Sequence, residues 1–147
     1  MPYLSYCLGT LSLLLVSLPL SAAVLQVYIT GVDVVSGGHL MVGVYDSQAT
    51  FLKDDGRIAE VKLAVAEAQD NRVATTFEKL TLDKKYAIAV YHDVNSNSKL
   101  DKNFFGIPKE GYGFSNNARG TFGPPSFDDA AILLDSENKL ITLYLSY

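Results

Sequence analysis

Asp and Asn side chains alternate with other residues in the stretch "DVNSNSKLD", which His92 separates from the apolar run "YAIAVY". Asp93, Asn95, Asn97 and Asp101 stand at positions 1, 3, 5 and 9 of this stretch, and Lys99 offers a backbone carbonyl at position 7. Calcium loops place oxygen ligands at these positions, so that the backbone curls around the cation. The spacing therefore predicts a weak Ca²⁺ site made of Asp93, Asn95, Asn97, Lys99 and Asp101.

The same ladder has a second interpretation that requires no ion. Asp and Asn side chains accept hydrogen bonds from backbone N–H groups two residues further on, and such Asx-turns are common in loops. Ser98 stands where calcium loops usually have glycine, and Phe104 stands where an EF-hand has a bidentate glutamate. With two carboxylates, the expected calcium Kd is ~10⁻⁴–10⁻³ M. The sequence leaves both alternatives open, a calcium site and a set of turns.

A histidine close to carboxylates could also carry out acid–base chemistry. A hydrolase-type centre would need folding to gather His92, Asp93, Glu110, Asp128 and Asp129 into one cleft. However, His92 and Asp93 are neighbours at the end of an expected strand, so their side chains diverge. The chain also has no G-x-S-x-G and no H-E-x-x-H sequence. We therefore expect a non-enzymatic protein in which His92 binds a loop carbonyl, and the hydrolase is the alternative.

The elements that position these residues are strands, because apolar residues recur with a period of two after residue 23. Expected strands cover residues 24–30, 38–46, 61–67, 73–80, 85–93, 129–135 and 139–147. Seven short strands without a long helical segment predict an all-β fold, an antiparallel seven-stranded β-sandwich. The chain has 147 residues and no linker, which indicates one domain over residues 24–147.

One long segment, residues 93–128, shows no periodicity but is rich in aromatic residues. Connections of this length are usually functional or disordered, and this composition is not that of a disordered segment. We expect one long ordered loop that packs on its own apolar side chains; a sugar-binding aromatic platform is the alternative. These side chains are Phe104, Phe105, Ile107, Tyr112, Phe114, Phe122 and Phe127.

The N-terminus reads as a targeting segment. Residues 8–20 are almost entirely apolar and are followed by Ser21, Ala22 and Ala23, small residues of the kind found before a signal-peptidase cut. This predicts a signal peptide over residues 1–23, a periplasmic or secreted protein, and no membrane span after cleavage. The lone cysteine, Cys7, would be removed with it, so the exported chain would contain no disulfide.

Composition excludes two further classes of protein. A net charge of −4 and a pI near 5.0 leave no basic face for the phosphates of a nucleic acid. Two distant histidines and one cysteine do not form a zinc-type cluster. We therefore expect no nucleic-acid partner and no zinc.

Residues 86–130, "YAIAVYHDVNSNSKLDKNFFGIPKEGYGFSNNARGTFGPPSFDDA", resemble the bacterial family called domain of unknown function 2141. Its pattern is H-D, N-x-N-G-x-L-D, G-I-P-x-E, G-F-S-N and G-P-P-x-F. The matching residues are His92, Asp93, Asn95, Asn97, Leu100, Asp101, Gly106, Pro108, Glu110, Gly113, Phe114, Ser115, Asn116, Gly123, Pro124, Pro125 and Phe127. Departures are Ser98 in place of glycine and "LDKKY" in place of a Pro-Gly turn.

The resemblance implies an exported bacterial protein with an immunoglobulin- or prealbumin-like sandwich, and it implies no particular activity. Fold alone does not supply one. From the residues and the resemblance together, we expect an exported binding or structural module, whose partner would be an envelope protein or a glycan. Ca²⁺ is the one cofactor that the residues suggest.

Overall fold

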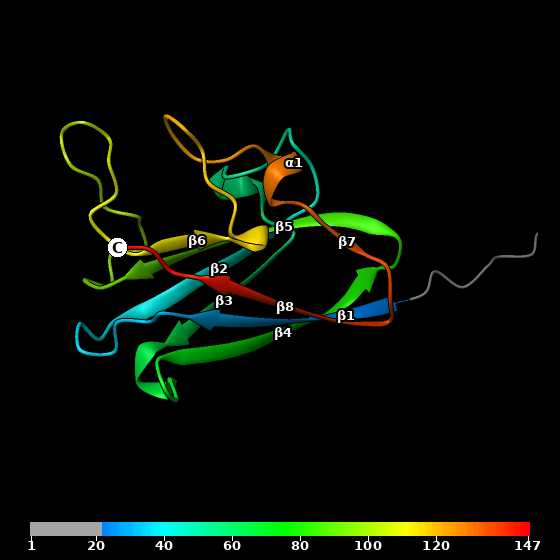
Figure 1. The fold of residues 1–147 in the computed structure, drawn as a ribbon, viewed down its shortest axis with the longest axis horizontal. Helices are drawn as coiled ribbons and strands as arrows, with labels where there is room; N and C mark the ends of the chain where they lie inside the picture. The colour runs from blue at the N-terminus through cyan, green and yellow to red at the C-terminus, as the bar shows by residue number, and fades with distance from the viewer. Residues whose placement is uncertain (1–21) are drawn as a thin grey trace, which may run out of the picture.

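The computed structural model describes residues 22–147, so the expected signal peptide lies outside the described residues except for Ala22 and Ala23. The described chain is all-β, with eight strands in two sheets (Figure 1). In the first sheet, β1 (Ala22–Thr30) lies between β4 (Arg72–Thr81) and β8 (Asn138–Tyr144). The second sheet has the order β3 (Ala59–Ala64), β2 (His39–Tyr45), β5 (Lys84–Asp93) and β6 (Tyr112–Phe114).

Short elements complete this framework. β7 (Ile132–Leu134) pairs with the beginning of β5, while β6 pairs with its later part. Three single-turn helices, η1 (Asp54–Gly56), η2 (Val65–Glu67) and η3 (Ser115–Asn117), and one short helix, α1 (Phe127–Ala130), lie between strands. No helix within residues 22–147 is both long and apolar enough to cross a membrane.

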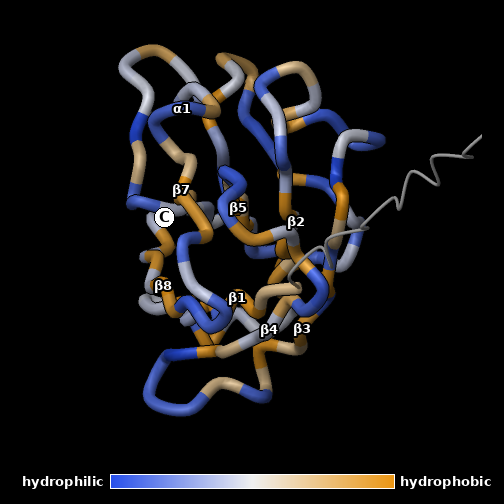
Figure 2. The backbone as a smooth tube through the Cα atoms, turned by 90° about the vertical axis from the view of Figure 1, so that its right-hand side faces the viewer, coloured by the Kyte–Doolittle hydropathy of each residue, from blue (hydrophilic) through white to orange (hydrophobic). Residues whose placement is uncertain are grey.

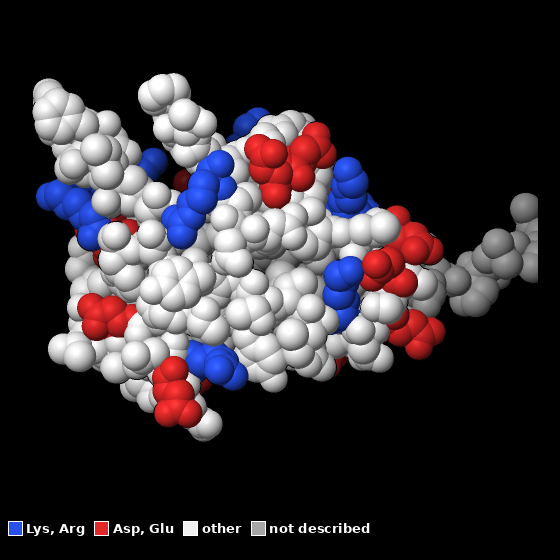
Figure 3. All heavy atoms as spheres, in the orientation of Figure 1, with Lys and Arg blue, Asp and Glu red and all other residues white. Residues whose placement is uncertain are grey.

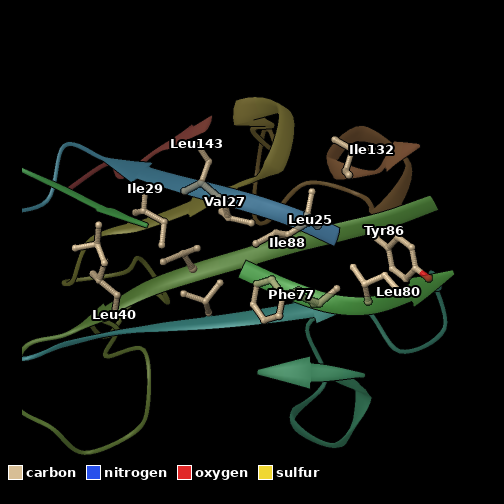
Figure 4. Close-up of a cluster of buried hydrophobic side chains, with 14 of the residues drawn as sticks. Leu25, Val27, Ile29, Leu40, Phe77, Leu80, Tyr86, Ile88, Ile132 and Leu143 are labelled. Carbon is tan, nitrogen blue, oxygen red and sulfur yellow. The ribbon is translucent and has the colours of Figure 1, made fainter. Parts of the chain in front are cut away.

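The period-two pattern produces the main hydrophobic core. Leu25, Val27 and Ile29 alternate along β1, and all three are fully buried. Figure 4 shows them pointing towards Ile88 of β5 across the space between the sheets. Burying one such side chain contributes about 1.5–3 kcal/mol, so this alternation fixes which face of each strand turns inwards. Along the backbone, hydrophobic residues follow the strands and hydrophilic residues gather in many connections (Figure 2).

The sandwich expected from the sequence is confirmed, with two differences. There are eight strands instead of seven, because β6 consists of only three residues, too few to show a period. Its central Gly113 is tightly enclosed, since an added Cβ would lie 2.6 Å from the Tyr144 carbonyl oxygen. The sheets are also not wholly antiparallel: β1 and β8 run parallel. β7 and β8 belong to different sheets, so a crossover and not a hairpin sets the direction of β8.

The segment 93–128 is ordered but is not one loop, because it contains β6, η3 and the first residues of α1. Part of it builds a second, smaller core around Phe51. The Phe51 ring lies 6.2 Å from that of Phe114 and 5.8 Å from that of Phe127. Phe114 and Phe127 are buried, as expected for residues that pack under this segment.

Tyr112 also packs against this smaller core, but the expectation of a single aromatic mini-core is wrong for the four remaining members of the group. Phe104, Phe105 and Phe122 are 97%, 83% and 103% exposed, and Ile107 is also exposed. They lie in two loops outside the regular elements, where no neighbouring element is available to cover them. The aromatic residues of this segment therefore divide into a buried set and an exposed set.

Candidate functional site

The predicted ladder begins at the end of β5 with Asp93, whose side chain is fully buried. One carboxylate oxygen accepts a hydrogen bond from the backbone N–H of Asn97 and the other from that of Ser98, each at 2.9 Å. Ser96 and Ser98 have φ values of 59° and 61°, in the left-handed region. The chain therefore folds into a tight turn around a buried carboxylate.

The remaining ladder residues bond to one another within the same turn. The side-chain amides of Asn95 and Asn97 donate to the two carboxylate oxygens of Asp101, at 2.7 Å and 3.1 Å. The amide oxygens accept from backbone N–H groups two residues on, Asn95 from Asn97 at 3.2 Å and Asn97 from Lys99 at 2.8 Å. The structure thus brings all five predicted residues into one turn, which we call the Asp93 turn (residues 93–101).

These contacts are the Asx-turn pattern, and they use every side-chain oxygen of the four polar residues. A Ca²⁺ ion bound to Asp101 would have to share a carboxylate whose two oxygens already accept from side-chain amides. In the part of the chain that the structure describes, no three side chains of His, Cys, Asp or Glu are grouped to hold a metal. Calcium binding remains a prediction, and the turn is complete without it.

Glu110 closes the Asp93 turn from outside and is the residue whose role the sequence did not reveal. Its buried carboxylate accepts from the backbone N–H of Val94 at 3.0 Å and from that of Asp101 at 2.9 Å. One side chain therefore joins the two ends of the turn, and we call this pair of hydrogen bonds the Glu110 clasp. The only sequence signal was its place in the G-I-P-x-E part of the family pattern.

His92 lies beside this clasp and is fully buried. Its Nε2 is 2.6 Å from the carbonyl oxygen of Gly37, so in the neutral ring Nε2 donates and Nδ1 accepts the hydroxyl of Tyr147 at 2.8 Å. That hydroxyl also accepts from the backbone N–H of Asp33 at 2.9 Å. Burial raises the pKa of Tyr147, which keeps the hydroxyl protonated and able to donate. His92 thus binds a loop carbonyl, as expected, and ties the C-terminus to the β1–β2 connection.

The residues of the alternative hydrolase centre are not gathered into one cleft. Asp128 approaches Lys85 at 3.7 Å, near the start of β5, whereas His92 and Asp93 lie at its other end. Lys85 and Asp93 are eight positions apart, or about 26 Å at the usual rise of a strand. Asp129 is used in a capping box with Ser126 at the start of α1. The described residues therefore offer His92 no free carboxylate partner.

A shallow depression does lie next to the Asp93 turn, lined among others by Asp33, Asp101, Lys109, Glu110 and Tyr147. Its polar groups are largely occupied by each other or by the backbone. The Ser36 hydroxyl, 2.6 Å from the carboxylate of Asp33, is the main cause that lowers the pKa of that carboxyl. The arrangement is that of a hydrogen-bonded support for the neighbouring loop.

Two loops extend outwards from this region, one from the Asp93 turn and one after η3. The first, which we call the Phe105 loop (residues 99–109), is a small hairpin. In it the backbone N–H of Lys109 donates to the carbonyl oxygen of Asp101 at 2.8 Å. The side-chain oxygen of Asn103 accepts from the backbone N–H groups of Phe105 and Ile107, at 2.9 Å and 3.0 Å. The second, the Phe122 loop (residues 118–125), follows η3. Figures 1 and 3 show both loops projecting from the same side of the sandwich.

Comparison with protein families gives one match. A family model described as "Uncharacterized protein conserved in bacteria", the domain of unknown function 2141, matches residues 27–142. The chain belongs to this family. No curated protein and no solved structure matches the chain.

Several residues of the pattern of domain of unknown function 2141 have structural roles in this chain. Ser115 accepts from the backbone N–H of Ile88 at 2.9 Å and donates to the carbonyl of Ala130, while Asn116 donates to the carbonyl of Ala131 at 2.8 Å. The G-F-S-N part therefore fastens β5 to the segment before β7. Together with Asp93 and Glu110, these residues hold the base from which the two loops extend.

Proposed function

We propose that this protein is an exported, non-enzymatic binding module of the bacterial envelope, and that it makes contact through the Phe105 and Phe122 loops. The observation that carries this proposal is the near-complete exposure of Phe104, Phe105 and Phe122 on two projecting loops, of which the Phe105 loop has a hydrogen-bonded base. Burying a phenylalanine contributes about 1.5–3 kcal/mol, so a partner that covers three exposed rings would gain a large favourable contribution to the free energy of binding.

The geometry of the polar residues supports a binding role in place of catalysis. Hydrogen bonds occupy both ring nitrogens of His92 and both carboxylate oxygens of Asp93. Neither side chain is accessible to a substrate, because both are fully buried. A general base must come within hydrogen-bond reach of the proton that it removes, and these groups do not.

Strand pairing supports the export part of the proposal. The seven residue pairs between β1 and β8 begin at Val24, the first residue after the expected cut. The pairing of β1 with β4 shifts between Ala23 and Leu25, so the regular ladder also starts beyond the cut. Cleavage after Ala23 would remove one buried alanine and two residue pairs with β4, and it would leave the pairing of β1 with β8 intact. For an exported module, a component of the bacterial envelope is the expected kind of partner, and the sequence suggested an envelope protein or a glycan.

Retention on isolated bacterial envelopes tests the proposal. The exported chain would be compared with a variant carrying Phe104→Ser, Phe105→Ser and Phe122→Ser, and with the control Val35→Ser, which replaces an apolar residue that is 94% exposed elsewhere. We expect retention of the exported chain and of the control, and a loss of at least tenfold in the triple variant. Equal retention of all three proteins would refute the assignment of the loops.

A further inference from the structure

The two loops combine apolar tips with positive charge, against the overall charge of the chain. Lys99, Lys102 and Lys109 lie in the Phe105 loop and Arg119 in the Phe122 loop, and all four are exposed. Asp101 is the only acidic residue within these two loops, so their net charge is +3 in a chain of net charge −4. Within residues 22–147, none of the four cations forms a salt bridge.

The neighbouring carboxylates are committed to other contacts. Asp101 accepts from two side-chain amides, and Glu110 is buried and binds two backbone N–H groups. On α1, Asp129 caps the helix and Asp128 approaches Lys85. Figure 3 shows the projecting loops as white tips with blue side chains near their bases. The two loops therefore present a net positive charge behind their aromatic tips, and the exposed carboxylates of α1 lie outside them.

We propose that these two loops insert their tips into the surface of an anionic lipid bilayer. The inference rests on the proposed function, since it names the partner of the same surface. Amphipathic surfaces bind bilayers by placing aromatic and aliphatic side chains at the acyl boundary and cations among the headgroups. Phe104, Phe105, Ile107 and Phe122 supply the apolar part, and the four cations supply attraction to anionic headgroups.

The shape of the surface favours lipid over the other partners. A stable protein interface covers about 800 Å² on each partner with close packing, and two separate projecting loops do not make such a continuous face. A sugar platform presents open aromatic faces beside hydrogen-bond donors and acceptors. Here the rings of Phe104 and Phe105 pack edge to face at 84°, and the nearby Asn103 oxygen is already used by the backbone.

Both loops project from one side of the sandwich, so a single plane can touch them together (Figures 1 and 3). The base of the Phe105 loop is held by the Glu110 clasp, which limits the entropy that this loop loses on binding. Insertion would need no rearrangement of the core, because every one of the apolar tips is already exposed.

The chain contains no tryptophan, which allows a direct test. Phe105→Trp introduces the only tryptophan at the proposed tip, and Val35→Trp introduces one at an exposed position outside the two loops. Each protein, as the full exported chain, would be titrated with vesicles of phosphatidylcholine alone and with vesicles in which about a third of the lipid is phosphatidylglycerol. We expect a blue shift and quenching by brominated acyl chains for Phe105→Trp with anionic vesicles, and neither for Val35→Trp.

Sedimentation with the same vesicles tests the charge. The double variant Lys102→Gln, Arg119→Gln should bind the anionic vesicles about 25-fold more weakly, at roughly fivefold for each lost cation. The control double variant Lys53→Gln, Lys62→Gln, which changes lysines outside the two loops, should bind them as the unaltered chain does. Added salt should weaken binding of the unaltered chain. These substitutions alter exposed side chains only, so the melting temperature should not change.

Two results would overturn the inference. The absence of a blue shift for Phe105→Trp on anionic vesicles would exclude insertion, and equal binding by the two pairs of charge variants would exclude the cationic surface. If the loops are still required for retention on envelopes, a protein or glycan is the partner and the proposed function stands. If envelope retention is also independent of the loops, both proposals fail.

Discussion

The clasp formed by Glu110 makes the most specific prediction about stability. Glu110 is 8% exposed, and its two carboxylate oxygens hold the N–H groups of Val94 and Asp101. In Glu110→Gln, one oxygen is replaced by an NH₂ group that faces an N–H donor, and the other bond loses its charged acceptor. Hydrogen bonds to charged groups contribute about 1.5–3 kcal/mol, and neutral ones about 0.5–1.5 kcal/mol. The substitution should therefore lower the free energy of unfolding by about 2–4 kcal/mol.

Urea denaturation of Glu110→Gln and of Glu78→Gln measures this effect. Glu78 is exposed on β4, so its substitution should change the free energy of unfolding by less than about 0.5 kcal/mol. For a domain of this size, the expected loss corresponds to a fall in melting temperature of roughly 6–12 °C. Amide exchange of Val94 and Asp101 should accelerate in Glu110→Gln alone. If both variants unfold at the same urea concentration, the clasp does not stabilise the loop and the reasoning is wrong.

Four further predictions follow from the same structure. Phe127→Ala should cost about 3–5 kcal/mol of stability in urea denaturation, and Phe122→Ala less than about 0.5 kcal/mol; similar losses would contradict the division into buried and exposed rings. Ser98→Gly should be more stable than Ser98→Ala by about 1 kcal/mol, because φ at this position is 61°; equal midpoints would argue against the left-handed turn. If Ca²⁺ binds the Asp93 turn with a Kd of ~1 mM, ~10 mM calcium should add about 1.4 kcal/mol, seen as a rise of a few degrees in calorimetric scans. Asp101→Asn should strongly reduce that rise, because it removes half of the formal ligand charge, and identical scans in calcium and in chelator would leave only Asx-turns. N-terminal sequencing of the periplasmic protein should begin at Val24, and an intact initiator methionine would exclude cleavage.

The alternation of apolar and polar residues was sufficient to predict the position of the strands that place one face in the main core. The expected strands 24–30, 73–80 and 85–93 agree with β1, β4 and β5 to within two residues at each end. Their alternation is strong because each places one face in the main core. The expected strand 129–135 proved to be the end of α1 followed by β7. Ser126 and Asp129, three residues apart, carried the signal of a capping box at that point.

The exposure of the loop phenylalanines could not be predicted in the same way. Phe114 and Phe122 are chemically identical, and both lie in the segment without periodicity. Their burial differs because Phe114 pairs with β5 and reaches Phe51, which is 63 positions earlier in the chain. Residue type alone predicts burial for every phenylalanine, and only the three-dimensional course of the chain distinguishes the buried rings from the exposed ones.

The contacts of the loop base indicate how one segment serves two purposes. Its polar residues satisfy one another, and within residues 22–147 no buried side-chain polar atom lacks a hydrogen-bond partner. Such a network fixes a backbone without adding reactive groups, so it accounts for the Asp and Asn ladder as a support. The exposed rings of Phe104, Phe105 and Phe122 contribute nothing to that support, because they touch neither hydrophobic core. Since these rings add no stability to the fold, and exposed apolar patches mark interaction sites, we infer that they contact a partner.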